Sequence, residues 1–191
     1  MKMSITREWA MPNHETFSIS PINKLIDRIL RSDTDGIWID PFVRNSKFKQ
    51  RMAHTNDLSL DFEATHHLDA LDFLNIFESQ SVDGVLFDPP YSPRQIAECY
   101  QGVGRKCSTR DTQSAFWGNL KKEIGRIIRP GGIAISCNWN SGGCGIRNGF
   151  EIIEILLVPH GGWHNDTIVT VEKRTNRAQI GYQRSFYENR H

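Results

Sequence analysis

The stretch Val82-Asp-Gly-Val-Leu-Phe87, followed at once by Asp88-Pro89-Pro90-Tyr91, gives the strongest indication of the fold. A short, mostly apolar run bounded by turn residues predicts a buried strand. The two prolines end the strand, because proline has no N–H to donate to a sheet and pushes the residue before it into an extended conformation. We therefore expect a buried strand that stops in a rigid turn carrying one acid and one aromatic residue.

Strands and helices alternate on both sides of this stretch. Helical spacing of apolar residues predicts helices over 22–30, 71–77 and 115–128. Apolar runs predict strands over 36–40, 51–57, 64–70 and 133–137, and the segments 150–158 and 167–173 predict a C-terminal antiparallel β-hairpin. Residues 1–16 are expected to be irregular and 91–114 to form a polar loop. The alternation predicts an α/β fold with a Rossmann-like, mainly parallel sheet.

Length and composition are those of one globular domain. The chain has 191 residues and a net charge of +1, so we expect one domain over 1–191, with a basic and aromatic tail at 174–191. The sequence has no long apolar run and no signal-peptide core, which predicts a cytoplasmic protein without a membrane partner. Four cysteines without a CxxC pair are expected to be thiols, and the scattered histidines predict no metal site.

Acidic residues follow four of the predicted strands. In an open α/β sheet, ligands bind outside the carboxyl ends of the strands. A shared rim would therefore bring together Asp40, Asp57, Asp69 and Asp88. The sequence predicts a ligand site at this rim.

The Asp-Pro-Pro-Tyr turn suits a planar ring that bears an amino group. The Asp88 carboxylate and the Pro89 carbonyl can accept the two amine hydrogens, while Tyr91 offers a face for stacking. Holding both hydrogens would draw the nitrogen lone pair out of the ring and make the amine nucleophilic. The turn therefore predicts transfer chemistry on an exocyclic amine.

At these residues the sequence resembles the DNA adenine-N6 methyltransferases, whose catalytic motif is Asp-Pro-Pro-Tyr and whose methyl donor is S-adenosylmethionine. The segments 18–25, 39–42 and 69–71 are similar to that family's donor-binding segments, and 129–133 is similar to the turn after its catalytic motif. The resemblance covers about residues 17–173 and matches the small forms that have no separate target-recognition domain. It implies a class I methyltransferase fold.

The resemblance also implies roles for particular residues. The catalytic residues would be Asp88, Pro89, Pro90 and Tyr91. The residues that bind S-adenosylmethionine would be Phe17, Ser18, Ile19, Asp40, Pro41, Phe42, Asp57, Asp69 and Ala70. One departure is that Val43-Arg44-Asn45-Ser46 follows Phe42, where the family usually has glycines. This departure predicts a donor pocket that is reshaped or weakened.

The nucleic-acid partner has its own candidate residues. Basic residues after the motif, and a tryptophan after the next strand, could grip phosphates or stack on a base: Arg94, Arg105, Lys106, Arg110 and Trp139. Without an evident recognition domain, target specificity would come from loops, from a homodimer or from a partner subunit. The small size suits a phage or mobile-element enzyme.

Three functions stay open at this point. The first is methyl transfer from S-adenosylmethionine to adenine N6 in DNA, without a metal. The second is the same chemistry on RNA adenine or on cytosine N4. The third is a catalytically inactive subunit that keeps the fold and binds nucleic acid or a partner, which the missing loop glycines favour.

Overall fold

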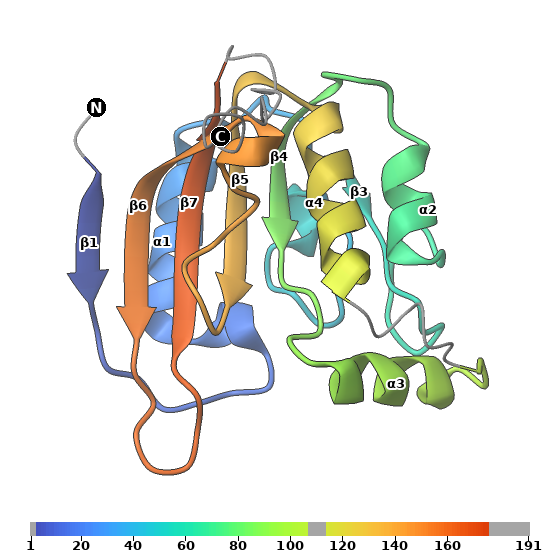
Figure 1. Cartoon of the computed structure of the whole chain (residues 1–191), viewed down its shortest axis with the longest axis horizontal. Coiled ribbons are helices and arrows are strands. Elements are labelled where there is room, and N and C mark those ends of the chain that lie inside the picture. The colour runs from blue at the N-terminus through green and yellow to red at the C-terminus, as the bar shows by residue number, and fades with distance from the viewer. Residues whose placement is uncertain (1–2, 107–113, 176–191) are drawn as a thin grey trace, which may run out of the picture.

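The computed structural model describes residues 3–106 and 114–175. These residues form a seven-stranded sheet in the order β1-β6-β7-β5-β4-β2-β3 (Figure 1). The strands are β1 (Ser4–Arg7), β2 (Trp38–Asp40), β3 (His54–Thr55), β4 (Val82–Phe87), β5 (Ile128–Asn138), β6 (Phe150–Val158) and β7 (Thr167–Arg174). Neighbouring strands are parallel except that β7 runs antiparallel to both β5 and β6. The predicted α/β sheet with a C-terminal antiparallel hairpin is confirmed.

Helices cover both faces of the sheet. The α-helices are α1 (Ser20–Arg31), α2 (Ala70–Asn75), α3 (Pro93–Gly102) and α4 (Ser114–Ile127). Single 3₁₀ turns are η1 (Thr16–Ser18), η2 (Lys49–Arg51) and η3 (Ile146–Asn148). Helix α1 lies on one face, α2 and α4 lie on the other, and α3 lies below the strand ends (Figure 1). The three helices expected from apolar spacing are present.

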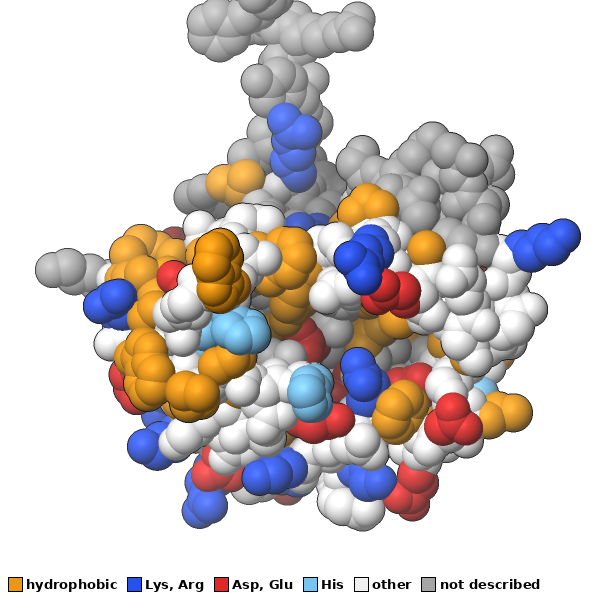
Figure 2. All heavy atoms as spheres, turned by 90° about the horizontal axis from the view of Figure 1, so that it is seen from below, with side chains coloured by type: hydrophobic (Ala, Val, Ile, Leu, Met, Phe, Trp, Pro, Cys, Tyr) orange, Lys and Arg blue, Asp and Glu red, His pale blue; other side chains and the backbone are white. Residues whose placement is uncertain are grey.

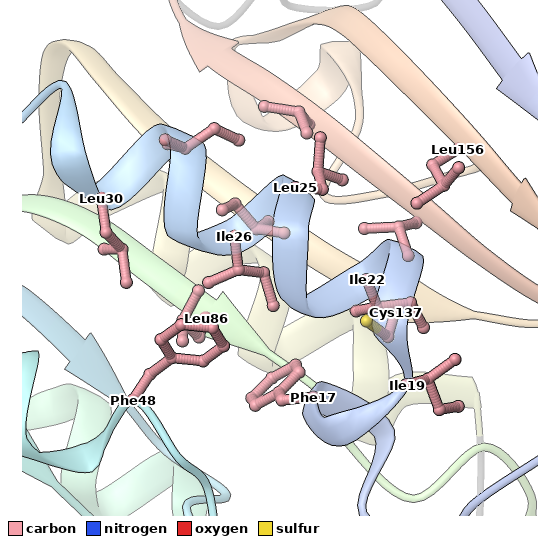
Figure 3. Packing of buried hydrophobic residues seen from close by; sticks show 14 of the residues in the cluster. Phe17, Ile19, Ile22, Leu25, Ile26, Leu30, Phe48, Leu86, Cys137 and Leu156 are labelled. Atoms are coloured by element: carbon pink, nitrogen blue, oxygen red, sulfur yellow. The ribbon is translucent and has the colours of Figure 1, made fainter.

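Helix α1 packs on the sheet because its apolar residues share one side. Ile22, Leu25 and Ile26 are buried against side chains of β4, β5 and β6, among them Leu86 and Cys137 (Figure 3). Pro21 stands in the first turn, where its missing N–H costs nothing. This packing holds the amino end of α1, and the η1 turn before it, close to the carboxyl end of β4.

The other sheet face packs against α2 and α4. Residues of β4 alternate between the faces: Val85 and Phe87 belong to this second core, whereas Leu86 belongs to the first. Gly84 has no side chain because Trp38 of β2 fills the space, and a Cβ there would lie 2.5 Å from the indole. The central strand is thus buried on both faces, and its carboxyl end is fixed.

Several elements differ from the sequence-based expectations. The expected turn at 129–133 is part of β5, and the expected strand over 51–57 is reduced to the two residues of β3. Residues 4–7 were expected to be irregular, but they form edge strand β1 because β6 offers a parallel partner. Residues 64–70 do not form a strand; only an isolated bridge joins Asn56 to His66, because side-chain hydrogen bonds hold the rest of that segment. The polar stretch after the motif contains α3, which starts where the Ser92 hydroxyl accepts a hydrogen bond from the Gln95 amide.

None of the described helices has both the length and the apolar character that a membrane crossing requires.

Candidate active site

A cavity of about 550 Å³ opens at the carboxyl ends of β2, β3 and β4. Its walls are the loops after these strands, the start of α2 and one side of α3. A smaller hollow of about 70 Å³ adjoins it and shares five lining residues with it: His14, Thr16, Phe42, Arg44 and Asp88. The main cavity is within the usual size range of small-molecule sites. Figure 2 looks onto this rim of the sheet.

The Asp-Pro-Pro-Tyr motif lines the main cavity with all four residues. The Tyr91 hydroxyl donates a hydrogen bond to Oδ1 of Asp88. Two bonds pin the backbone: the Trp117 indole donates to the Pro90 carbonyl over 2.8 Å, and the Tyr91 amide donates to Oε1 of Gln95 over 2.7 Å. The motif is therefore held from α4 and α3 as well as by its own prolines.

Asp88 has an unusual proton affinity for a carboxyl group. Burial raises the pKa of Asp88 to about 6, even though hydrogen bonds from Tyr91 and Thr16 and the charge of Arg44 act in the opposite direction. A carboxyl with a pKa near the operating pH can accept a proton during a reaction and release it afterwards. The burial of Tyr91 and the nearby carboxylate likewise raise the pKa of the Tyr91 hydroxyl, so this group stays protonated.

The aromatic ring of Tyr91 lies beside Trp139, which follows β5. The two ring centroids are 5.5 Å apart in an edge-on arrangement, and the Trp139 side chain is 42% exposed. The loop after Trp139 is fixed from beneath, because the buried Glu172 carboxylate of β7 accepts hydrogen bonds from the Cys144 and Gly145 amides. The structure thus brings Trp139 to the Asp-Pro-Pro-Tyr motif.

The loop after β2 makes its turn without glycine. Arg44 has a φ of 41°, in the left-handed region that glycine adopts most readily. Its amide donates to Oδ2 of Asp57 over 3.1 Å, and its guanidinium lies 5.3 Å from the centre of the Phe62 ring. The backbone bend that a glycine would give is therefore present, and the side chain of Arg44 is placed between the two hollows.

Asn56 joins the loops around the cavity, and sequence reasoning missed it. Its amide nitrogen donates to the carbonyls of Pro41 and Leu68 at 3.2 and 3.1 Å, while its Oδ1 accepts from the Leu68 amide at 2.9 Å. The side chain is only 1% exposed. The sequence did hold a clue to this role, because Asn56 directly precedes Asp57 at the end of a predicted strand.

The acids predicted at the rim separate into two groups. Asp57 and Asp69 line the cavity. Asp69 also caps α2 through the Leu71 amide and accepts a hydrogen bond from the Tyr100 hydroxyl. Asp40 is fully buried instead and supports the loop from below, since its Oδ1 accepts from the Phe42 amide at 3.0 Å.

The other residues predicted to bind the donor differ in whether they line the main cavity, the smaller hollow or neither. Pro41, Phe42 and Ala70 line the main cavity. Phe17 and Ser18 line the smaller hollow, although most of Phe17 is buried in the core. Ile19 packs in the core and lines neither of the two hollows. Two residues outside the sequence prediction, His14 and Thr16, line both hollows because η1 passes the end of β4.

The basic residues predicted to contact nucleic acid lie in and after α3. Arg94 is exposed and pairs with Glu98 one helical turn away, at 2.7 Å. Arg105 and Lys106 are exposed just after α3. Arg110 lies outside the described residues. Arg94, Arg105 and Lys106 do not line the cavity, although other residues of α3 do.

No protein-family model and no curated protein matches this sequence. Solved structures do share its fold. NSun6 from Pyrococcus horikoshii, solved with SFG, matches with a TM-score of 0.54 and 12% identity over 78% of this chain and 50% of its own. SMU.776, described as a candidate methyltransferase and complexed with SAH, matches with a TM-score of 0.52 and 10% identity over 78% of this chain and 48% of its own.

A third structure has nearly the same extent as this chain. YhhF from Escherichia coli, described as a candidate methyltransferase, matches with a TM-score of 0.53 and 10% identity over 88% of this chain and 92% of its own. The chain spans about half the length of the other two proteins. At these identities the likeness establishes the fold alone: the chain has the Rossmann-like α/β fold of these three structures.

Proposed function

We propose that the protein transfers a methyl group from S-adenosylmethionine to N6 of adenine in DNA. The observation that carries the proposal is the Asp88-Pro89-Pro90-Tyr91 turn, which lies at the carboxyl end of β4 and opens into a cavity of about 550 Å³. The fold supports the proposal, since one structure with the same fold was solved as a complex with SAH.

The cavity has the chemistry to hold the donor. Asp57 and Asp69 provide carboxylates for hydroxyl and amino groups, and Phe42, Ala70 and Phe116 provide apolar surface for a planar ring. Arg44 places a cation at the junction of the two hollows, where it can meet the carboxylate of an amino-acid moiety. When bound, S-adenosylmethionine supplies a methyl group that its sulfonium has already activated.

The motif residues act on the target amine. The Asp88 carboxylate and the Pro89 carbonyl accept the two hydrogens of the amine, which localises the nitrogen lone pair. Tyr91 and Trp139 provide aromatic surface beside Asp88 for a base that has left its stack. As the new N–C bond forms and the methyl–sulfur bond breaks, the nitrogen loses one proton. Asp88 accepts that proton, for which its raised pKa of about 6 suits it.

A labelled donor tests the proposal directly. The protein is incubated with methyl-labelled S-adenosylmethionine and unmethylated DNA, and the digested nucleosides are separated. Label in N6-methyl-2′-deoxyadenosine is the expected result, because this is the nucleoside that methylated DNA releases on digestion. Asp88→Ala should abolish transfer, whereas Asp35→Ala, an exposed acid in the turn before β2, should leave it unchanged. Transfer by the Asp88→Ala variant at the wild-type rate would disprove the assignment.

The same assay separates the other candidate functions. Label that appears only in RNA, or on cytosine N4, would move the activity to that substrate while keeping the chemistry. An inactive subunit would bind nucleic acid and transfer no label to any polymer, and calorimetry would then show no binding of S-adenosylmethionine. Binding of S-adenosylmethionine together with methyl transfer to adenine in DNA supports the proposed enzyme over these other candidate functions.

A further inference from the structure

A strip of large hydrophobic side chains is exposed on the cavity-bearing rim and belongs to neither hollow. It consists of Trp9, Met11 and Trp163, which we call the tryptophan strip. Their exposed fractions are 63%, 68% and 103%, although large apolar side chains are usually buried. Figure 2 shows hydrophobic side chains gathered to the left of the hollow, on the side of the β6–β7 hairpin.

The backbone that carries the strip is firmly held. Past β1, the Glu8 amide donates to the Leu157 carbonyl and the Ala10 amide donates to the Pro159 carbonyl, at 3.0 and 3.2 Å. The ring of buried His160 lies between the segments, with Nδ1 at 2.9 Å from the Ala10 carbonyl and Nε2 at 2.8 Å from Oγ1 of Thr167. The two indoles are thus presented to solvent from fixed supports.

The Trp9 indole lies beside the hairpin loop that carries Trp163, although the sequence separates the two residues widely. A Cβ placed on Gly161 would lie 3.7 Å from the indole nitrogen of Trp9, and Trp163 follows Gly161 by two residues. The residues around Trp163 that share its exposure are small or polar: Gly161, Gly162, His164, Asn165 and Asp166. Among residues 161–166, Trp163 is therefore the one large apolar side chain, so the strip is narrower than the broad apolar patch that a protein interface buries.

The strip leads into the cavity along a short piece of chain. Trp9 and Met11 precede His14 and Thr16, which line both hollows. Five residues from Trp9 to His14 span at most about 18 Å, a distance that a few nucleotides can cover. On the same rim Trp139 contacts Tyr91 of the motif. The rim therefore carries exposed aromatic side chains at two places, beside the Asp-Pro-Pro-Tyr motif and at the β6–β7 hairpin.

We propose that the tryptophan strip is a stacking platform for single-stranded nucleic acid, which holds the bases that flank the one entering the cavity. This proposal rests on the proposed function. Exposed indoles stack on unpaired bases regardless of sequence, whereas a duplex buries the faces of its bases. The platform adds a substrate surface on the hairpin side of the cavity to the basic residues in and just after α3.

Binding without a methyl donor tests the platform. We would measure fluorescence anisotropy of a short fluorescein-labelled DNA strand with the wild-type protein and with the double variant Trp9→Ala/Trp163→Ala. Stacking of one base on an aromatic side chain typically changes affinity by roughly five- to a hundredfold, so the double variant should bind at least about tenfold more weakly. Trp9→Phe/Trp163→Phe should restore part of the affinity, because it keeps aromatic faces.

A matched control removes an exposed apolar side chain elsewhere. Ile146 in η3, which packs against α4 and the start of β6, is 69% exposed, so Ile146→Ala should bind the strand like wild type. The annealed duplex of the same sequence should show little difference between wild type and the double variant. Circular dichroism of each variant checks that the fold is kept.

Each result decides for or against the platform. Unchanged single-strand affinity in the double variant overturns it, as does an equal loss of affinity for the duplex. A wild-type dimer in sedimentation that the double variant loses, without change in strand affinity, assigns the strip to a second copy of the chain instead. Weakened strand binding without methyl transfer by the wild type would keep the platform and reject the methyltransferase. Methyl transfer that depends on Asp88, with unchanged strand affinity in the double variant, would keep the methyltransferase and reject the platform.

Discussion

The Tyr91 hydroxyl donates a hydrogen bond to the Asp88 carboxylate three residues before it. The acid that would receive the target amine is therefore already held by the aromatic residue that would stack on the target. This contact fixes the carboxylate in the cavity wall and lowers the pKa of Asp88 against the stronger effect of burial.

Tyr91→Phe should shift the acid limb of the pH profile. In the proposed reaction Asp88 acts as a carboxylate, so activity should fall as the pH drops through its pKa of about 6. Removing the hydroxyl removes a hydrogen bond that lowers this pKa, so the limb should move to higher pH while the aromatic face remains. The measurement is kcat/KM against pH. Tyr100→Phe, which removes a hydroxyl bonded to Asp69 instead, should leave the limb in place.

Asp40→Asn should stabilise the fold at neutral and alkaline pH. Burial raises the pKa of Asp40 to about 8, from 3.8 in the unfolded chain. Between these values the unfolded chain loses the proton while the folded protein keeps it, so wild-type stability falls as the pH rises through this window.

Asparagine keeps the acceptor for the Phe42 amide and has no proton to lose. One pKa unit corresponds to about 1.4 kcal/mol, and burying the extra amide group costs part of the gain, so we expect on the order of 3 kcal/mol at pH 8. Urea unfolding at pH 4 and pH 8 checks this, with Asp35→Asn as the surface control. Equal gains at both pH values would contradict titration of Asp40 as the cause.

Arg44→Gly and Arg44→Ala should differ in stability. The positive φ of Arg44 costs any residue with a Cβ about 1 kcal/mol, which glycine avoids. Both variants lose the guanidinium, so the difference between their free energies of unfolding reports on the backbone conformation at position 44. Urea unfolding should show the glycine variant to be more stable by about 1 kcal/mol. A more stable alanine variant would show that the loop does not need the left-handed bend.

Asn56→Ala should weaken both the fold and the cavity. The substitution leaves the Pro41 carbonyl and the Leu68 carbonyl and amide without their side-chain partner. Losing such buried hydrogen bonds costs about 1–3 kcal/mol, and the loops that carry Phe42 and Asp69 lose their connection. Urea unfolding and calorimetry with S-adenosylhomocysteine measure the two effects. Reduced stability with unchanged binding would limit Asn56 to a role in folding.

The sequence predicted the central strand and its turn because local chemistry determines both. The apolar run 82–87 is buried in any α/β arrangement, and two consecutive prolines end a strand wherever it lies. The cavity-lining position of Asp57 could also be anticipated, since parallel strands share a carboxyl edge. Asp69 lines the cavity for another reason, because it caps α2 and the strand expected before it does not form.

The features that the sequence did not reveal depend on distant partners. Strand β1 exists because Ser4 pairs with Glu154, far along the chain, and its own residues show no strand alternation. Thr16 reaches Asp88 only because α1 packs on the sheet and carries η1 to the end of β4. Asp40 looked like its neighbours at the rim, but the Phe42 amide turns its carboxyl inward.

The direction of β1 has a practical consequence. Ser4 pairs with Glu154 and Arg7 with Leu157, so β1 runs toward the cavity and its first residues lie at the opposite edge of the molecule. A dye or surface anchor attached through a cysteine at position 4 would leave the cavity opening facing freely into solution, provided that Cys99, an exposed thiol in the cavity wall, is first replaced by serine. Immobilised molecules could then be followed one at a time as oligonucleotides arrive and depart.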